Sequence, residues 1–187
     1  MSNDNPERTS LSNAARTLLR GLWDVVSTVL MALLITLVIN TYIAQATTID
    51  GPSMQPNLYY DYRVMVEKVT YHLIHGPRRG DVAVFDIPGE ETSLIKRVVA
   101  LPGETIEVRD GHTYIDGERI EEPWVQNFGG PDCPPTVIPP LHVFVMGDNR
   151  PSSRDSRAFG PVHVDQIVGR AVFIYWPPGQ VGVLVNW

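Results

Sequence analysis

Near the N-terminus lies the longest uninterrupted apolar run of the chain. No Asp, Glu, Lys or Arg occurs between residues 25 and 49. The hydrocarbon core of a bilayer is about 30 Å thick, so a helix needs about 20 apolar residues to cross it. Residues 22–44 meet that requirement. The pattern predicts a transmembrane helix within an anchor at residues 22–46, preceded by an N-terminal tail at residues 1–21.

Basic residues before this run predict its orientation. Arg8, Arg16 and Arg20 precede the apolar residues, and the cytoplasmic flanks of membrane helices carry an excess of Lys and Arg. We therefore expect a cytoplasmic N-terminal tail and an extracytoplasmic domain at residues 47–187.

Two other interpretations of the run compete with an anchor. Arginines, an apolar run and then Ala44-Gln45-Ala46 also fit a secretory signal with an A-x-A cleavage site, although the apolar region of such a signal spans only about 7–15 residues. A buried helix of a soluble protein would usually show a polar face, whereas Ser, Thr and Asn are scattered here. The length of the run favours an uncleaved anchor.

Beyond residue 46 several segments alternate apolar and polar residues with a period of two, which is typical of half-buried strands. Asp110-Gly111 and Asp116-Gly117 are turn signals within one of them. The 16 Pro and 15 Gly also oppose a helical bundle. The predicted fold is mostly β, with a single N-terminal transmembrane helix and coiled antiparallel sheets. The predicted strand segments are 62–69, 81–87, 105–120, 142–148 and 169–176.

Other parts of this domain give weaker signals. Residues 123–140 are rich in Pro and Gly and are expected to form a surface loop. Short helical turns fit residues 70–75 or 164–167.

Charge and cysteine usage narrow the function. The net charge of −6 argues against a nucleic-acid partner. The single cysteine, Cys133, forms no internal disulfide and cannot build a cysteine-rich metal site.

Histidine-based chemistry has little support. Only His72 and His75 are close in sequence, and no HExxH pattern accompanies them. Chain order does not exclude a Ser-His-Asp triad, but no histidine lies in a stretch that resembles a site. Phosphate-loop and dinucleotide glycine patterns are absent from the sequence. A serine activated by a lysine remains to be considered.

A lysine acts as a base only when neutral, and burial lowers its pKa by disfavouring the ammonium. Lys96 fits this requirement, because the stretch "LIKRVV" surrounds it with apolar residues. An edge-strand lysine that points to water is the competing interpretation. Ser53, in "DGPSMQPNLYY", directly follows the apolar run. It is either part of a turn that leaves the membrane or a nucleophile held beside it.

A third stretch, "VMGDNRPSSRDSRAFGPV" at residues 145–162, places many hydrogen-bonding groups of both charges between two apolar strands. Such a concentration suits a buried network that supports an active site. Taken alone, it would also suit a solvated loop.

Together these stretches resemble the bacterial type I signal peptidases, which are membrane-anchored serine proteases with a Ser-Lys dyad. The motifs "GPSMQPNL", "RRGDVAVF", "KRVVALPGE" and "GDNRPSSRDSRAFGPV" carry the resemblance, in the family's order and behind one membrane helix. The likeness covers most of the chain. The compact region at residues 103–146 is similar to that of the smaller family members.

The resemblance implies a role for each matching residue. Ser53 is the expected nucleophile and Lys96 the general base. The expected oxyanion donors are the backbone N–H of Ser53 and a group at position 51. Gly51 has no side chain, so its donor is a backbone N–H or a water. The supporting residues are Ser153, which bonds the lysine amine; Asp155, which pairs with Arg97 and Arg157; and Gly147, Asp148 and Asn149, which shape the loop behind. Ile49, Ile95 and Thr47 are expected to line substrate pockets.

The resemblance also implies the function. We expect removal of signal peptides from exported precursors after A-x-A-like sites, through an acyl-enzyme, at a bacterial plasma membrane. The implied partners are precursors and the lipid bilayer, and no cofactor or metal is implied. Self-processing after Ala46 stays open, because Ala44-Gln45-Ala46 fits the same specificity.

Two rival functions remain. A self-cleaving repressor shares the dyad, but it needs a DNA-binding helical domain and an Ala-Gly cleavage site, which this sequence lacks. A non-enzymatic, membrane-anchored β-domain would need neither Ser53 nor Lys96.

Overall fold

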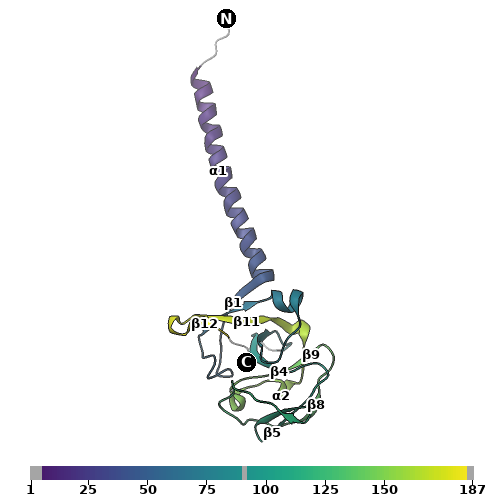
Figure 1. Ribbon diagram of the computed structural model, residues 1–187. Coiled ribbons are helices and arrows are strands. Elements are labelled where there is room, and N and C mark those ends of the chain that lie inside the picture. Colours follow the sequence, from purple (N-terminus) through teal and green to yellow (C-terminus); the bar gives the residue numbers. More distant parts are fainter. Residues whose placement is uncertain (1–5, 90–91, 185–187) are drawn as a thin grey trace. The chain divides into compact units, whose positions relative to one another are not determined.

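A computed structural model describes residues 6–89 and 92–184. The chain divides into two compact units, residues 1–41 and residues 42–187 (Figure 1). Helix α1 (Pro6–Val38) continues into a π-helical turn, η1 (Ile39–Ile43).

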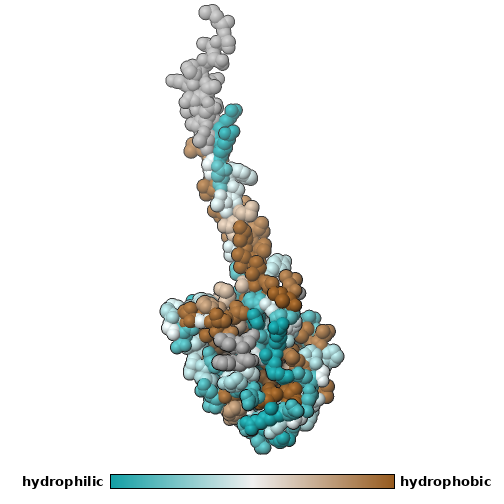
Figure 2. Space-filling view, in the orientation of Figure 1, coloured by the Kyte–Doolittle hydropathy of each residue, from teal (hydrophilic) through white to brown (hydrophobic). Residues whose placement is uncertain are grey.

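The apolar part of this helical segment is long enough to cross a membrane. It covers Leu18–Ile43, 26 residues, and none of its most apolar window is buried. Hydrophobic residues gather along this part of α1 in Figure 2. The apolar segment ends three residues before the predicted end of the anchor. Residues 44–46 instead belong to strand β1 (Ala44–Thr48), whose backbone pairs with β2 (Arg63–Glu67).

A large antiparallel sheet forms most of the second unit. Its strand order is β1-β2-β11-β3-β4-β9-β10, with β12 paired to β11. Register shifts interrupt the pairing of β11 with both β2 and β3, and such bulges increase strand twist and bending. The remaining strands are β3 (Val82–Phe85), β4 (Leu94–Ala100), β9 (His142–Met146), β10 (Val162–His163), β11 (Ile167–Trp176) and β12 (Gly182–Val183).

A second, four-stranded antiparallel sheet has the order β7-β6-β5-β8. In Figure 1, β5 and β8 lie at the far end of the β-domain from β1 and β12. The predicted hairpin is confirmed, with positive φ angles at both residues of each Asp-Gly turn. Its strands are β5 (Thr105–Arg109), β6 (His112–Ile115), β7 (Glu118–Arg119) and β8 (Cys133–Val137).

The mostly β fold is confirmed, and all five predicted strand segments contain strands. The prediction of a surface loop at residues 123–140 is wrong in part, because β8 lies within it. Pro134 and Pro135 can occupy this strand because β8 pairs with β5 alone and lies at the edge of the sheet.

The helical turns are short. Both predicted ones occur, as η2 (Thr70–Ile74) and η4 (Val164–Gln166). The others are η3 (Arg150–Ser152), α2 (Ser156–Phe159) and η5 (Pro178–Gln180).

Hydrophobic packing joins the segment after β1 to the large sheet. Met54 and Leu58 are fully buried and pack in one cluster with Val64, Val84 and Ile95. Burial of a side chain of this size contributes about 1.5–3 kcal/mol. The segment that contains Ser53 is therefore held firmly against the strands β2, β3 and β4.

Candidate active site

Ser53 lies in a tight turn at residues 52–58, called here the Ser53 turn. The turn is closed by hydrogen bonds from Gln55 N–H to Pro52 O, 3.1 Å, and from Leu58 N–H to Met54 O, 2.9 Å. Gly51, just before the turn, has a φ of 103°, which non-glycine residues rarely adopt. The burial of Met54 and Leu58 leaves the Ser53 side chain half-buried, facing a cleft.

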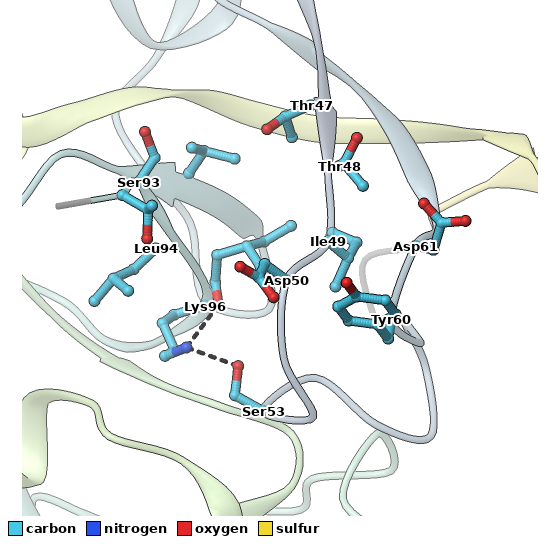
Figure 3. A pocket seen from close by; sticks show the side chains of 13 residues that line it. Thr47, Thr48, Ile49, Asp50, Ser53, Tyr60, Asp61, Ser93, Leu94 and Lys96 are labelled. Atoms are coloured by element: carbon cyan, nitrogen blue, oxygen red, sulfur yellow. Dashed lines mark hydrogen bonds between the residues drawn. The ribbon is translucent and has the colours of Figure 1, made fainter.

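Lys96 lies on β4 between the neighbouring strands β3 and β9, opposite Ala83 of β3. This position excludes an edge-strand lysine that points to water, and its exposed fraction is 4%. Its Nζ lies 2.8 Å from Ser53 Oγ and 3.0 Å from the carbonyl oxygen of Ile95 (Figure 3). The structure thus brings the two predicted catalytic residues into direct contact.

The surroundings of Lys96 prepare it to act as a base. Burial disfavours the ammonium and lowers the pKa of Lys96 from 10.5 to about 8, although the negative charges of Asp155 and Asp148 oppose this shift. A substantial neutral fraction at mildly alkaline pH follows.

Arg97, the next residue on β4, forms a buried ion pair. Its Nε and Nη2 donate to the two carboxylate oxygens of Asp148 at 2.8 and 2.7 Å. The expected pair between Arg97 and Asp155 is therefore wrong. The β4–β9 register places Arg97 opposite Met146, two residues before Asp148, so the guanidinium reaches Asp148 first.

Asp155 pairs with Arg157, as expected. Nε and Nη2 of Arg157 donate to its carboxylate at 2.9 and 2.8 Å, and Gly147 N–H adds a third bond at 3.1 Å. Burial alone would raise the pKa of Asp155, but the Arg157 guanidinium and the Gly147 N–H hold it below its usual value. The nearby Ser153 hydroxyl, although outside hydrogen-bond geometry, acts in the same direction. Asp155 is thus a stably charged carboxylate behind the site.

Ser153 occupies a different position from the one expected. Its hydroxyl oxygen is buried and, among the described residues, has no hydrogen-bond partner. The expected bond to the Lys96 amine is therefore not formed. Ser153 instead packs against Gly147, where a Cβ atom would lie only 2.6 Å from Ser153 Cβ and would also overlap Ser53 O.

Asn149 fastens the start of the Ser53 turn. Its backbone N–H donates to Ser53 O at 3.0 Å, and its side-chain amide donates to Pro52 O at 3.2 Å. Within the described chain, the backbone N–H groups of Ser53 and Gly51 donate no hydrogen bond. Both remain free to serve a developing oxyanion.

Sequence reasoning did not identify several residues that complete this network. Arg150, 1% exposed, joins Glu122 to the carbonyl oxygen of Gly147. Trp124 lies beneath the Arg97 guanidinium, 4.8 Å from its ring centroid. Asn57 bonds both Trp124 and Asp148. Only the dense charges of "DNRPSSRDSR", residues 148–157, offered a signal, because Glu122 and Trp124 lie at the N-terminal edge of the Pro-rich stretch.

The cleft in front of Ser53 and Lys96 has a volume of about 430 Å³. The three expected pocket residues line it together with both catalytic candidates (Figure 3). The lining residues are Thr47, Thr48, Ile49, Asp50, Ser53, Tyr60, Asp61, Val84, Thr92, Ser93, Leu94, Ile95 and Lys96.

A serine hydroxyl beside a buried lysine amine of lowered pKa is the arrangement that a serine hydrolase with a lysine base requires. Comparison with known proteins gives the family: its model, signal peptidase, peptidase S26, matches residues 22–176. This chain therefore belongs to the signal peptidase family and is a membrane-anchored serine endopeptidase that removes signal peptides from precursor proteins.

Two relatives found by sequence agree with this assignment. Signal peptidase I of Leptolyngbya laminosa is 37% identical over 171 residues, 87% of this chain and 84% of that protein. Thylakoidal processing peptidase 1 of Arabidopsis thaliana is 35% identical over 161 residues, 80% of this chain and 47% of that protein. A signal peptidase I crystal structure from Enterococcus faecalis aligns with a TM-score of 0.45 at 32% identity, covering 50% of this chain and 95% of that one.

Proposed function

We propose that Ser53 and Lys96 form the catalytic dyad with which this peptidase cleaves signal peptides through an acyl-enzyme. The observation that carries the proposal is the 2.8 Å separation of Ser53 Oγ and Lys96 Nζ. The lowered pKa of Lys96 supports it further, because only a neutral amine accepts a proton.

In the first half of the reaction, neutral Lys96 takes the proton of Ser53 Oγ as this oxygen attacks the scissile carbonyl carbon. The carbonyl oxygen becomes an oxyanion, and we assign its stabilisation to the backbone N–H groups of Ser53 and Gly51. When the intermediate collapses, the C–N bond breaks and the Lys96 ammonium returns its proton to the leaving amine. The signal-peptide part then remains bound to Ser53 as an ester.

In the second half, Lys96 takes a proton from a water molecule that attacks this ester. The ester bond breaks, the Lys96 ammonium gives its proton to Ser53 Oγ, and the signal peptide leaves with a carboxyl group that ionises in water. Six further residues support the site without reacting: Arg97, Asp148, Asn149, Ser153, Asp155 and Arg157.

Substrate selection is assigned to the cleft walls. Ile49, Ile95 and Thr47 line the cleft beside Ser53, and we assign to them the preference for Ala or Gly at positions −1 and −3 that the family resemblance implies.

We further assign the apolar segment, Leu18–Ile43, to the membrane region, with the residues before it in the cytoplasm and the β-domain outside a bacterial plasma membrane. Arg16, just before the apolar segment, and Arg20, at its start, support this orientation. A site close to the bilayer suits a substrate whose own apolar helix is held there, because confinement lowers the entropic part of the barrier.

The dyad is tested by processing of a precursor with an A-x-A site. Ser53→Ala, Lys96→Met and Lys96→Arg should each lower kcat/KM by at least about 1,000-fold, the last because a guanidinium stays protonated. The matched control Ser152→Ala, at an exposed position, should retain wild-type activity. The same precursor with Leu at −1 should resist the wild-type enzyme. Turnover by Ser53→Ala would end the assignment.

A further inference from the structure

Asn57 lies near the end of the Ser53 turn, and its side-chain amide makes two hydrogen bonds across the domain. Nδ2 donates to Asp148 Oδ2 at 2.7 Å and to the carbonyl oxygen of Trp124 at 2.8 Å. The two partners are distant in sequence, so a single amide connects three segments: the turn, the loop after β9 and the stretch that contains Trp124.

The bond from Asn57 is not needed to neutralise Asp148. Arg97 already donates to both carboxylate oxygens of Asp148, and this pair is almost fully buried. A buried carboxylate with a bidentate guanidinium has its charge and hydrogen-bonding needs largely met. The Asn57 bond must therefore be considered for what it does to the turn.

Asn57 and Asn149 hold the two ends of the Ser53 turn on the same support. Asn149 bonds the carbonyl oxygens of Pro52 and Ser53 at the start of the turn. Asn57 bonds Asp148, the residue before Asn149, at its end. Asp148 is in turn fixed to Arg97, the residue after Lys96. A closed ring of bonds thus connects the nucleophile with its base.

The turn itself transmits position because it is stiff. Met54 and Leu58 are fully buried, and Leu58 N–H donates to Met54 O at 2.9 Å. Asn57 lies between these two buried residues, so a displacement of its amide would move the turn as a unit. Such a movement would be passed back to Ser53, four residues before Asn57.

We propose that Asn57 is a positioning residue: its amide sets the distance and orientation of Ser53 Oγ relative to Lys96 Nζ. The inference rests on the proposed dyad. It predicts that loss of the amide slows acylation of Ser53 and leaves substrate binding nearly unchanged, because the cleft walls do not include Asn57.

The test compares Asn57→Ala and Asn57→Thr in the full chain with an A-x-A precursor. In Asn57→Ala, kcat should fall by about 10- to 100-fold, the scale of loss for a misplaced catalytic group, with KM changed less than about threefold. The rate of acylation by a small β-lactam-type serine probe should fall by a similar factor. Asn57→Thr, which retains one hydroxyl donor, should lie between Ala and wild type.

Asn127→Ala is the matched control, since Asn127 is exposed, and it should keep wild-type kinetics. An Asn57→Ala enzyme with wild-type kcat and probe reactivity would overturn the inference, even if its Tm were lower. A rise in KM alone would overturn it as well. Ser53→Ala, assayed in parallel, separates the two hypotheses: activity there refutes the dyad, whereas an inactive Ser53→Ala with a fully active Asn57→Ala refutes only the role of Asn57.

Discussion

At Lys96 two electrostatic influences oppose each other. Burial among apolar side chains lowers its pKa, whereas Asp155 and Asp148 raise it, and burial is the stronger influence. The carboxylates oppose the shift only weakly because each is itself paired with an arginine, Asp155 with Arg157 and Asp148 with Arg97. The result, a pKa of about 8, leaves Lys96 protonated in most molecules at pH 7 and neutral in most at pH 9.

The value of kcat/KM should therefore rise with pH. Only the neutral amine is the base, so activity should increase about tenfold per pH unit below pH 7 and level off above about pH 9. A soluble A-x-A peptide assayed from pH 6 to 10 measures this profile. A histidine base with its usual pKa near 6.5 would level off more than a pH unit earlier. A plateau that is already reached at pH 7 would contradict the assignment of Lys96.

Single residues also mark what the sequence could reveal. Lys96 was recognisable because apolar neighbours on both sides predict a buried strand, and the motifs around Ser53 added the resemblance to a family. The partner of Arg97 was not recognisable, because it depends on the β4–β9 register, which no local pattern determines. Asn57 and Trp124 gave no signal for the same reason: their contacts cross 91 and 27 positions of sequence respectively.

Among the elements, strands were easier to predict than their pairings. Period-two alternation indicated β2, β3, β9 and β11, but it did not indicate that β11 pairs with β2 and β3, which lie far before it in the sequence. Strand β8 was missed because its prolines suggest a loop, and only an edge position admits them. The Ser53 turn acquires its shape from Met54 and Leu58, whose burial depends on strands formed later in the chain.

Gly147, directly after β9, is the point where close packing brings three parts of the site together. Gly147 follows Met146, donates to Asp155 and contacts both Ser153 and the carbonyl oxygen of Ser53. A Cβ atom at this position would have to displace Ser153, whose Cβ would lie only 2.6 Å away. Glycine is required here by the lack of space.

Gly147→Ala should accordingly lower the activity strongly and the free energy of unfolding only moderately. Overpacking of this kind costs about 1–3 kcal/mol of unfolding free energy, while the displaced Ser53 should lower kcat/KM by about 100-fold. Urea unfolding and precursor cleavage measure the two effects. Gly179→Ala, with no atom within 4 Å of the added carbon, should leave both unchanged. Near-normal activity of Gly147→Ala would show that the Ser53 turn tolerates displacement.

At the scale of the whole molecule, the two units differ in whether their apolar side chains are buried within the protein. The apolar segment Leu18–Ile43 has no core of its own to enter, since none of its most apolar window is buried. Among its described residues, the β-domain has three hydrophobic clusters, and the first of them holds the Ser53 turn. A bilayer would therefore remove from water the apolar side chains that the apolar segment leaves exposed.

Orientation across that bilayer can be measured with introduced cysteines, because the native Cys133 is buried and gives a low background. A membrane-impermeant maleimide added to intact spheroplasts should label Asn127→Cys, in the β-domain. It should label Ser12→Cys, before the apolar segment, only after the membrane is permeabilised. The expectation follows from Arg16 and Arg20, whose charges favour the cytoplasmic side. The reverse pattern would place the β-domain in the cytoplasm, where precursors that have crossed the membrane could not reach Ser53.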